Sequence, residues 1–290
     1  MGTKKISPIY YFAVASMALL FFVFHTIPFL QGIFYSFTDW KGYGNWEWVG
    51  IRNYLQLFKD PDVLGAYAFT FTFAIITTIL VNILSLTLAC ALNAKIAFSG
   101  FLKAVYFLPY MLGNLMIGFI FNFIFAHIVP QIGQFLGIEA LSVNILGTDK
   151  AMWGIIFVTV WSCSAFNTLI YTAGLKSISD DIYEAAAIDG ASGIKRFTGI
   201  TFPLLATSFT INMVLSIKGF LMVYDQIMAM TGGGPGMETT SIAVLIYKRG
   251  LTGGQFAYQS ANAVILFIIV ATVSLLQLRF LEKREAKYND

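Results

Sequence analysis

The chain has 290 residues, of which 58% are hydrophobic and 11% are charged, and its mean hydropathy is +0.75. Soluble domains contain about 25% charged residues, so this composition excludes an ordinary soluble domain and indicates a membrane protein. The formal net charge of +3 is too small to indicate a nucleic-acid partner.

Six apolar segments are each long enough to cross about 30 Å of hydrocarbon as a helix that rises about 1.5 Å per residue. Because lipid offers no hydrogen-bond partner to the backbone, runs of this length are expected to be helical. We therefore predict an all-α integral membrane protein with one transmembrane domain over residues 1–290. The predicted spans are residues 9–37, 64–93, 101–127, 151–175, 203–229 and 259–281.

The distribution of basic residues predicts the orientation of these spans. With the N-terminus in the cytoplasm, eleven of the 18 Lys and Arg residues lie in inside segments and six lie in outside loops. This bias favours both termini inside. The first span has no small-residue cleavage site after it, so we expect it to be retained rather than removed as a signal peptide.

No group of residues predicts catalysis or metal binding. His25 and His127 lie in different spans without nearby cysteine or carboxylate partners, and Cys90 and Cys163 lie in apolar runs. We expect these four side chains to pack as core or interface residues. The phosphate-loop pattern G-x-x-x-x-G-K-[ST] is absent from the sequence, so we expect this chain to bind neither ATP nor another cofactor.

A charged stretch, DDIYEAAAIDGASGIKRFTGITFPLL at residues 180–205, separates the fourth and fifth spans. Asp181 and Glu184 have the spacing of a capping box at the start of a helix. Gly190 suits the left-handed residue that closes a helix, and Ser192 suits the cap of a second helix that stops before the next proline. The pattern predicts two short helices joined at a glycine bend on the cytoplasmic surface, which we call the elbow.

The alanines of the elbow favour a docking surface over a simple connector. Ala185, Ala186 and Ala187 remove side-chain bulk and allow another body to approach closely. The carboxylates available to pair with a partner's arginines are those of Asp181, Glu184 and Asp189. A well-capped connector remains the alternative.

The elbow resembles the EAA loop of ABC-importer permeases, in which E-A-A is followed by G after three residues, I after nine and L-P after one. Here Glu184-Ala185-Ala186 is followed by Gly190, Ile200 and Phe202-Pro203, with phenylalanine in place of the usual leucine. The flanking stretches FNTLIYTAGLKSISDDIYEAAAIDGA, DQIMAMTGGGP and WVGIRNYLQLF resemble the carbohydrate-uptake branch. The chain is similar to the maltose-type F subunit, although it lacks that protein's extra spans and large outside domain.

The resemblance implies the type I ABC importer permease fold, with six transmembrane helices and a cytoplasmic EAA loop over residues 178–203. It also implies a heterodimer with a second permease subunit in a bacterial or archaeal cytoplasmic membrane. Two cytoplasmic ATPase subunits would bind ATP and Mg, and a solute-binding protein outside would deliver a sugar. The coupling contacts implied by the resemblance are Asp181, Glu184, Ala185, Ala186, Asp189 and Gly190.

The same resemblance implies a substrate pathway through the middles of the fourth and fifth spans. Polar side chains in spans are costly unless they face a cavity or another helix, so helix packing is the alternative role. Lys218 and Asp225 are seven residues apart, which would place them on nearly the same helix face about 10 Å apart along the axis. The pathway residues are Thr159, Ser162, Cys163, Phe166, Ser216, Gly219, Phe220 and Val223. The expected outer gate or binding-protein contacts are Lys218, Asp225, Gly232, Gly233, Gly234 and Pro235.

Two other functions remain open at this point. A permease of the same architecture for a non-sugar solute, such as a glycerol phosphate, fits the same motifs. An ion-coupled secondary transporter would show inverted repeats and intramembrane carboxylates, and the sequence offers no repeat and only Asp225 as a carboxylate candidate.

Overall fold

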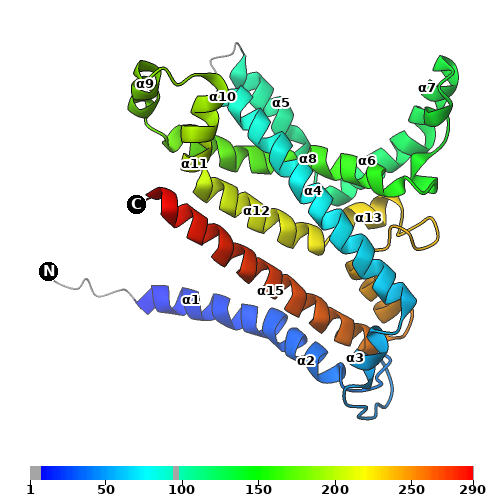
Figure 1. The fold of residues 1–290 in the computed structure, drawn as a ribbon. Coiled ribbons are helices and arrows are strands. Elements are labelled where there is room, and N and C mark those ends of the chain that lie inside the picture. The colour runs from blue at the N-terminus through cyan, green and yellow to red at the C-terminus, as the bar shows by residue number, and fades with distance from the viewer. Residues whose placement is uncertain (1–7, 94–97, 290) are drawn as a thin grey trace. The chain divides into compact units, whose positions relative to one another are not determined.

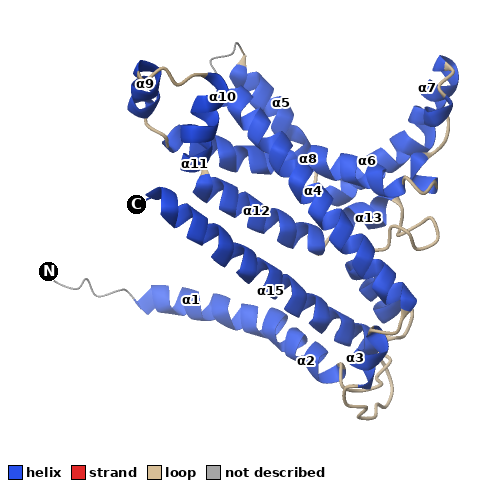
Figure 2. Ribbon diagram, in the orientation of Figure 1, coloured by secondary structure: helices blue, strands red, loops and turns tan. Residues whose placement is uncertain are grey.

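The computed structural model describes residues 8–93 and 98–289, and its regular secondary structure is entirely helical over those ranges (Figures 1 and 2). The prediction of an all-α chain is confirmed. An isolated antiparallel bridge joins Thr38 and Trp48 in the first loop. Three lysines counted for the predicted orientation, Lys4, Lys5 and Lys95, lie outside the described residues.

The chain divides into two compact units, one made of residues 1–60 and 246–267 and the other of residues 61–245 and 268–290. The first unit contains α1 (Pro8–Phe21), α2 (Ile27–Tyr35), α3 (Arg52–Leu57), a π-helical turn (Ile246–Thr252) and the start of α15 (Phe256–Asn289). The second unit contains α4 (Pro61–Asn93), α5 (Ser99–Met111), α6 (Asn114–Phe123), α7 (Val129–Leu136), α8 (Ala151–Ser177), α9 (Asp180–Ile188), α10 (Gly193–Arg196), α11 (Phe202–Leu204), α12 (Ala206–Leu221), α13 (Asp225–Met230), α14 (Ile242–Leu245) and the end of α15.

Five helical segments in the described residues are long and apolar enough to cross a membrane. A sixth span results if Gly193–Leu204 and Ala206–Leu221, which meet at an angle of 70°, are counted together. The five segments are Ile9–Tyr35, Pro61–Asn93, Asn114–Leu136, Ala151–Ser177 and Phe256–Lys283.

The third predicted span, residues 101–127, is not one helix in the structure. Helix α5 ends at Met111, and α6 begins at Asn114 after a glycine with a positive φ, Gly113 (φ 76°). Pro109 lacks an amide hydrogen and weakens the last turn of α5, while glycine adopts positive φ without a steric penalty. The apolar run therefore covers two helices, and the membrane-length helix continues to Leu136.

The fifth predicted span, residues 203–229, is also interrupted. Helix α12 ends at Leu221 and α13 begins at Asp225 after a short link. Lys218 and Asp225 consequently lie on different helices, so the prediction that they share a helix face is wrong. That prediction assumed an unbroken helix between them.

Three π-helical turns in the described chain each end two residues before a proline. Each proline lacks the amide hydrogen that would bond to the carbonyl four residues earlier, and its ring crowds that carbonyl. The α-helical hydrogen-bond pattern is therefore disturbed just before the proline, where π turns are an established adjustment. The turns are Phe22–Thr26 before Pro28, Ile124–Ile128 before Pro130 and Phe197–Thr201 before Pro203.

A buried hydrogen-bond network joins α4, α8 and α12 within the second unit. The Tyr171 hydroxyl on α8 donates to Asn82 Oδ1 on α4 at 2.7 Å. The Asn167 amide donates to Ser216 Oγ on α12 at 2.8 Å, and the Asn212 amide of α12 donates to the carbonyl oxygen of Asn167 at 3.1 Å. Because buried polar groups are costly unless paired, this network favours one arrangement of the three helices.

Helices α6 and α13 approach each other closely in the second unit (Figure 1). A Cβ atom added to Gly118 of α6 would lie 2.5 Å from the Cβ of Ala229 on α13. The Asn122 amide of α6 also donates to the carbonyl oxygen of Met230 at 2.5 Å. Glycine at position 118 therefore permits the contact that holds α13 in place.

We predict that Gly118→Ala destabilises the protein by about 1–3 kcal/mol, because overpacking forces the helices apart. Thermal unfolding of the purified protein in detergent measures the change. Gly65→Ala in α4 is the matched control, because a Cβ atom there meets nothing within 4 Å. A Gly118→Ala variant as stable as Gly65→Ala would contradict the close contact.

Candidate functional site

The first helix of the elbow, α9, is capped by a serine. Ser179 has an extended backbone, and its Oγ accepts a hydrogen bond from the amide of Asp181 at 3.3 Å. The predicted capping box of Asp181 and Glu184 is therefore wrong, because Asp181 already lies inside the first turn. The acidic residues of that turn, Asp180 and Asp181, still favour the positive end of the helix.

The glycine bend that follows α9 agrees with the prediction. Gly190 has φ 75°, a left-handed conformation that glycine adopts readily. The amide of Gly190 donates to the carbonyl of Ala187 at 3.1 Å, and the amide of Ala191 donates to that of Ala186 at 2.9 Å. These bonds close the helix in the way that a glycine terminator does.

The second helix of the elbow runs through Pro203 rather than stopping before it. It extends over Gly193–Leu204, and Pro203 lies at the start of its last segment, α11. The π-helical turn Phe197–Thr201 that precedes it accommodates this proline within the helix. Ser192 occupies the cap position of this helix, but its side chain makes no capping bond.

A buried leucine anchors the 70° bend between the elbow and α12. Leu205 lies at the bend with 1% of its surface exposed. Its hydrophobic cluster also contains Ala89, Tyr171 and Leu175, from α4 and α8. The end of the elbow is therefore fixed to the two helices that α12 packs against.

The exposed face of the elbow differs from the predicted alanine surface. Ala186 is only 4% exposed, whereas Ile188 and Ile194 are 88% and 79% exposed. Consecutive helix residues point about 100° apart, so three adjacent alanines do not share one face. The prediction that Ala186 belongs to an exposed surface is wrong. The other predicted coupling residues, Asp181, Glu184, Ala185, Asp189 and Gly190, are exposed.

Tyr183 connects the two helices of the elbow. The guanidinium carbon of Arg196 lies 5.7 Å from the centre of the Tyr183 ring, within the range of a cation–π contact. The hydroxyl of Thr201 donates to the Tyr183 hydroxyl oxygen at 3.4 Å. The elbow is therefore held together by its own side chains.

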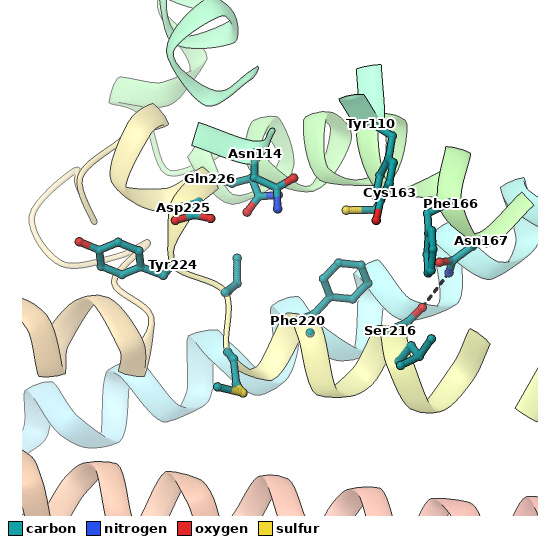
Figure 3. Close-up of a pocket in the computed structure, with 14 residues that line it drawn as sticks. Tyr110, Asn114, Cys163, Phe166, Asn167, Ser216, Phe220, Tyr224, Asp225 and Gln226 are labelled. Carbon is teal, nitrogen blue, oxygen red and sulfur yellow. Dashed lines mark hydrogen bonds between the residues drawn. The ribbon is translucent and has the colours of Figure 1, made fainter. Parts of the chain in front are cut away.

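A cavity of about 350 Å³ lies in the second unit where two helices are interrupted (Figure 3). Its walls come from α8 and α12, from the break between α5 and α6, and from the link between α12 and α13. The lining residues are Tyr110, Asn114, Cys163, Phe166, Asn167, Leu215, Ser216, Gly219, Phe220, Met222, Val223, Tyr224, Asp225 and Gln226.

Most of the predicted pathway residues lie around this cavity. Thr159 and Ser162 do not: both are buried, and their hydroxyls donate to the carbonyl oxygens of Ile155 and Thr159 at 2.8 and 3.3 Å. Their place in the predicted pathway stays a prediction, since the structure shows only that their hydroxyls bond within their own helix and do not line this cavity. The predicted residues that line the cavity are Cys163, Phe166, Ser216, Gly219, Phe220 and Val223.

Sequence reasoning missed the residues that reach the cavity from the helix breaks. Tyr110 precedes the first break, and its ring stacks on that of Phe166 with centroids 5.2 Å apart. Asn114 follows the same break, while Tyr224 and Gln226 flank the start of α13. Gly113 was the available signal for the first break, since an apolar run alone shows no interruption.

The cavity combines aromatic faces with neutral polar groups. The lining contains four aromatic rings together with amide and hydroxyl groups, and Asp225 is its one charged residue. Such a lining suits a small polar molecule that also has apolar faces. The described residues hold no group of three or more His, Cys, Asp or Glu side chains able to bind a metal ion.

The glycine-rich turn after α13 does not line the cavity. Thr231 Oγ1 and Thr239 Oγ1 lie 2.8 Å apart, and the Thr240 hydroxyl donates to the carbonyl of Gly233 at 3.0 Å. Gly233 has φ 93°, and a Cβ atom there would lie 2.5 Å from Thr240 Oγ1. Gly232, Gly233, Gly234 and Pro235 thus form a turn closed by threonine side chains. Lys218 is exposed and also absent from the lining, so among the predicted gate residues Asp225 alone lines the cavity.

We predict that Cys163, in a Cys90→Ala background, reacts faster with a cationic methanethiosulfonate reagent than with an anionic one of similar size. The Asp225 carboxylate makes the local potential negative, which concentrates cations. Asp225→Asn should reduce the ratio of the two rates about threefold. Asp149→Asn, an exposed residue outside the cavity, should leave the ratio unchanged. Equal ratios in all three proteins would contradict the described cavity.

Comparison with known proteins identifies relatives over nearly the full chain. Residues 82–287, more than half of the chain, match the family "Binding-protein-dependent transport system inner membrane component". The multiple sugar-binding transport system permease protein MsmF of Streptococcus mutans is 39% identical over 265 residues, 91% of each chain. The sn-glycerol-3-phosphate transport system permease protein UgpA of Brucella abortus is 32% identical over 284 residues, covering 97% of this chain and 96% of UgpA.

A solved structure shares the fold at low sequence identity. A chain of a bacterial ABC transporter for import of the acidic polysaccharide alginate superposes with a TM-score of 0.84. The two chains are 19% identical, and the match covers 95% of each. Family membership and fold together give one conclusion: the chain belongs to the binding-protein-dependent ABC transporter permeases and is a multi-pass transport subunit of the inner membrane rather than an enzyme.

Proposed function

We propose that this chain imports a sugar or an oligosaccharide across the cytoplasmic membrane as one permease of an ATP-driven, binding-protein-dependent importer. The observation that carries the substrate class is the lining of the cavity between α8 and α12. Aromatic rings provide flat apolar faces for a sugar ring. The hydrogen-bonding groups for hydroxyls are Asn114, Asn167, Ser216 and Gln226. The likeness to MsmF supports the same substrate class.

A glycerol phosphate is the second candidate solute, because UgpA is 32% identical to this chain. The cavity gives it less support. Phosphate sites in proteins are generally built from Arg or Lys side chains or from backbone amides at helix ends. Helices α6 and α13 begin at the cavity, but its lining contains neither Arg nor Lys, and the carboxylate of Asp225 in the first turn of α13 would repel a phosphate there.

The elbow is the proposed contact with the cytoplasmic ATPases. Ile188 and Ile194 are large, exposed apolar side chains beside exposed carboxylates, a combination that suits insertion into a partner's pocket with a charged rim. The elbow connects the end of α8 to the start of α12, and both helices line the cavity. A partner that moves the elbow would therefore act on the walls of the cavity.

The transport cycle follows as a two-state equilibrium. We propose that ATP and Mg are bound by two partner subunits and that this chain binds neither. ATP-driven closure of those subunits would favour one arrangement of the elbows, and hydrolysis would favour the other. The coupling energy is the difference in elbow binding between the two access states. A second, homologous permease subunit would complete the path, with both termini of this chain in the cytoplasm.

Uptake by the reconstituted complex with its binding protein tests the substrate class. We expect ATP-dependent uptake of a labelled neutral sugar and little uptake of labelled glycerol phosphate. Gly219→Leu should lower sugar uptake at least tenfold, because a side chain at this cavity position meets open space and fills the path. Gly65→Leu, at a position with equal space outside the cavity, should retain uptake. Preferred uptake of glycerol phosphate would favour the second candidate.

The elbow contact predicts that Ile188→Asp reduces ATP-driven uptake at least tenfold. A charge at the centre of an apolar contact is costly to bury, so the ATPase subunits should dissociate or fail to couple. Ile188→Val, which keeps an apolar side chain, should retain most of the activity. Co-purification of the ATPases and vesicle uptake measure the two effects. Normal coupling in Ile188→Asp would exclude this residue from the contact.

A further inference from the structure

The first unit contains a separate cavity of about 400 Å³ that the proposed transport path does not use. It is formed by the loop after α2, by α3 and by residues 249–258. Most of its lining is polar or charged. The lining residues are Asp39, Trp40, Lys41, Arg52, Asn53, Gln56, Asp60, Arg249, Gly254, Gln255, Ala257 and Tyr258.

Hydrogen bonds fix the loop that forms one wall of this cavity. The amide group of Asn53, a 5% exposed residue, donates to the carbonyl oxygens of Ser36 and Thr38 at 2.8 and 2.7 Å. The backbone amide of Ala257 donates to the carbonyl of Trp40 at 2.9 Å. The wall is therefore tied to α3 and to the start of α15, and the cavity is preorganised.

The Trp40 side chain adds an aromatic contact to the same wall. Its ring stacks on Tyr35 with centroids 4.1 Å apart and meets Phe256 edge-on at 5.0 Å. The Trp40 ring therefore packs against other rings of the first unit.

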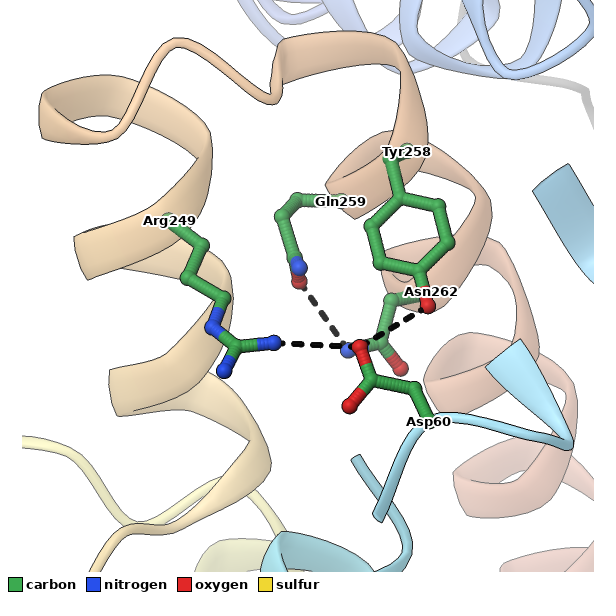
Figure 4. Close-up of polar contacts among 5 residues, drawn as sticks. All are labelled: Asp60, Arg249, Tyr258, Gln259 and Asn262. Carbon is green, nitrogen blue, oxygen red and sulfur yellow. Dashed lines mark hydrogen bonds and ion pairs between the residues drawn. The ribbon is translucent and has the colours of Figure 1, made fainter. Parts of the chain in front are cut away.

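Both carboxylates in the lining already have hydrogen-bond donors. Asp60 Oδ2 accepts from Arg249 Nη1 at 3.0 Å and from the Tyr258 hydroxyl at 3.1 Å, as Figure 4 shows. Asp39 Oδ1 accepts from the backbone amide of Glu47 at 2.7 Å. Each carboxylate of the cavity therefore has at least one hydrogen-bond donor from within the protein, and Asp60 also has an ion-pair partner.

Two cationic side chains of the lining have no such ion-pair partner in the described part of the chain. Lys41 and Arg52 are exposed, and neither has an ion-pair partner among the residues that the structure describes. Arg52 and Gln56 lie four residues apart on α3 and so share a face of that helix. The lining contains three cations against two carboxylates, so the cavity suits an additional negative group that two side chains can reach.

We propose that this cavity is a socket for a carboxylate side chain of the solute-binding protein, an inference that rests on the proposed function. The loops that form it precede α4 and α15, and the orientation predicted from the basic residues assigns these loops to the outside of the membrane. A protein carboxylate would pair with Arg52 and Lys41 at the rim while the polar walls restrict its orientation. Charge pairs of this kind increase the association rate and select the correct partner.

The test is ATPase stimulation of the reconstituted complex by its purified binding protein at increasing concentration. Arg52→Glu and Lys41→Glu should each raise the half-maximal concentration about tenfold, which corresponds to about 1.4 kcal/mol, without changing the maximal rate. Arg52→Gln should give a smaller increase in the same direction. Lys59→Glu is the matched control, because Lys59 is an exposed cation near Asp60 that does not line the cavity.

The outcomes separate the socket from the function on which it rests. Unchanged basal ATPase activity without binding protein would show that the variants remain folded and assembled. Equal half-maximal concentrations for Arg52→Glu, Lys59→Glu and the wild type would overturn the socket alone. A wild-type complex that the binding protein does not stimulate would overturn the proposed function, and the socket with it.

Discussion

The buried hydrogen bonds among α4, α8 and α12 are the constraint on which the second unit depends. Tyr171 and Asn82 join α8 to α4, while Asn167, Ser216 and Asn212 join α8 to α12. In hydrocarbon there is no difference in polarity between lipid tails and apolar side chains, so packing and polar pairs must select the arrangement of helices. Ser216 belongs to this network and also lines the cavity, so the same bond that aligns the helices orients one of its polar walls.

The cavity lies where the helical backbone is broken. The interruptions at Leu112–Gly113 and Met222–Tyr224 both contribute or flank lining residues. Non-helical backbone at membrane depth is tolerated only where protein surrounds it or where it lines a polar cavity. The close contact at Gly118 then holds α13 beside α6, which keeps the second break in position. The helix breaks that line the cavity therefore depend on the close helix contact that holds them in position.

The sequence was informative where local chemistry is decisive. Apolar run length predicted the all-α class, and the need for positive φ predicted Gly190 as the end of α9. The sequence was less informative where the outcome depends on burial or on which of several adjacent residues caps a helix. Ser179 caps α9 instead of the predicted Asp181, and Ala186 faces inward because helix geometry separates it from Ala185 and Ala187. Hydropathy also cannot distinguish one long helix from two, which hid Tyr110 and Asn114 from the predicted cavity.

The bend at Leu205 has a mechanical consequence for the helix that follows it. The elbow segment Gly193–Leu204 has twelve residues, about 18 Å of helix, and it meets α12 at 70°. With Leu205 held in its hydrophobic cluster, a sideways displacement of about 2 Å at the far end of this arm amounts to a rotation of about 6°. If the 70° angle between the two helices stays constant, the opposite end of the sixteen-residue α12 moves by about 2.5 Å. A small sideways movement of this arm is thereby turned into tilting of a helix that forms a wall of the cavity.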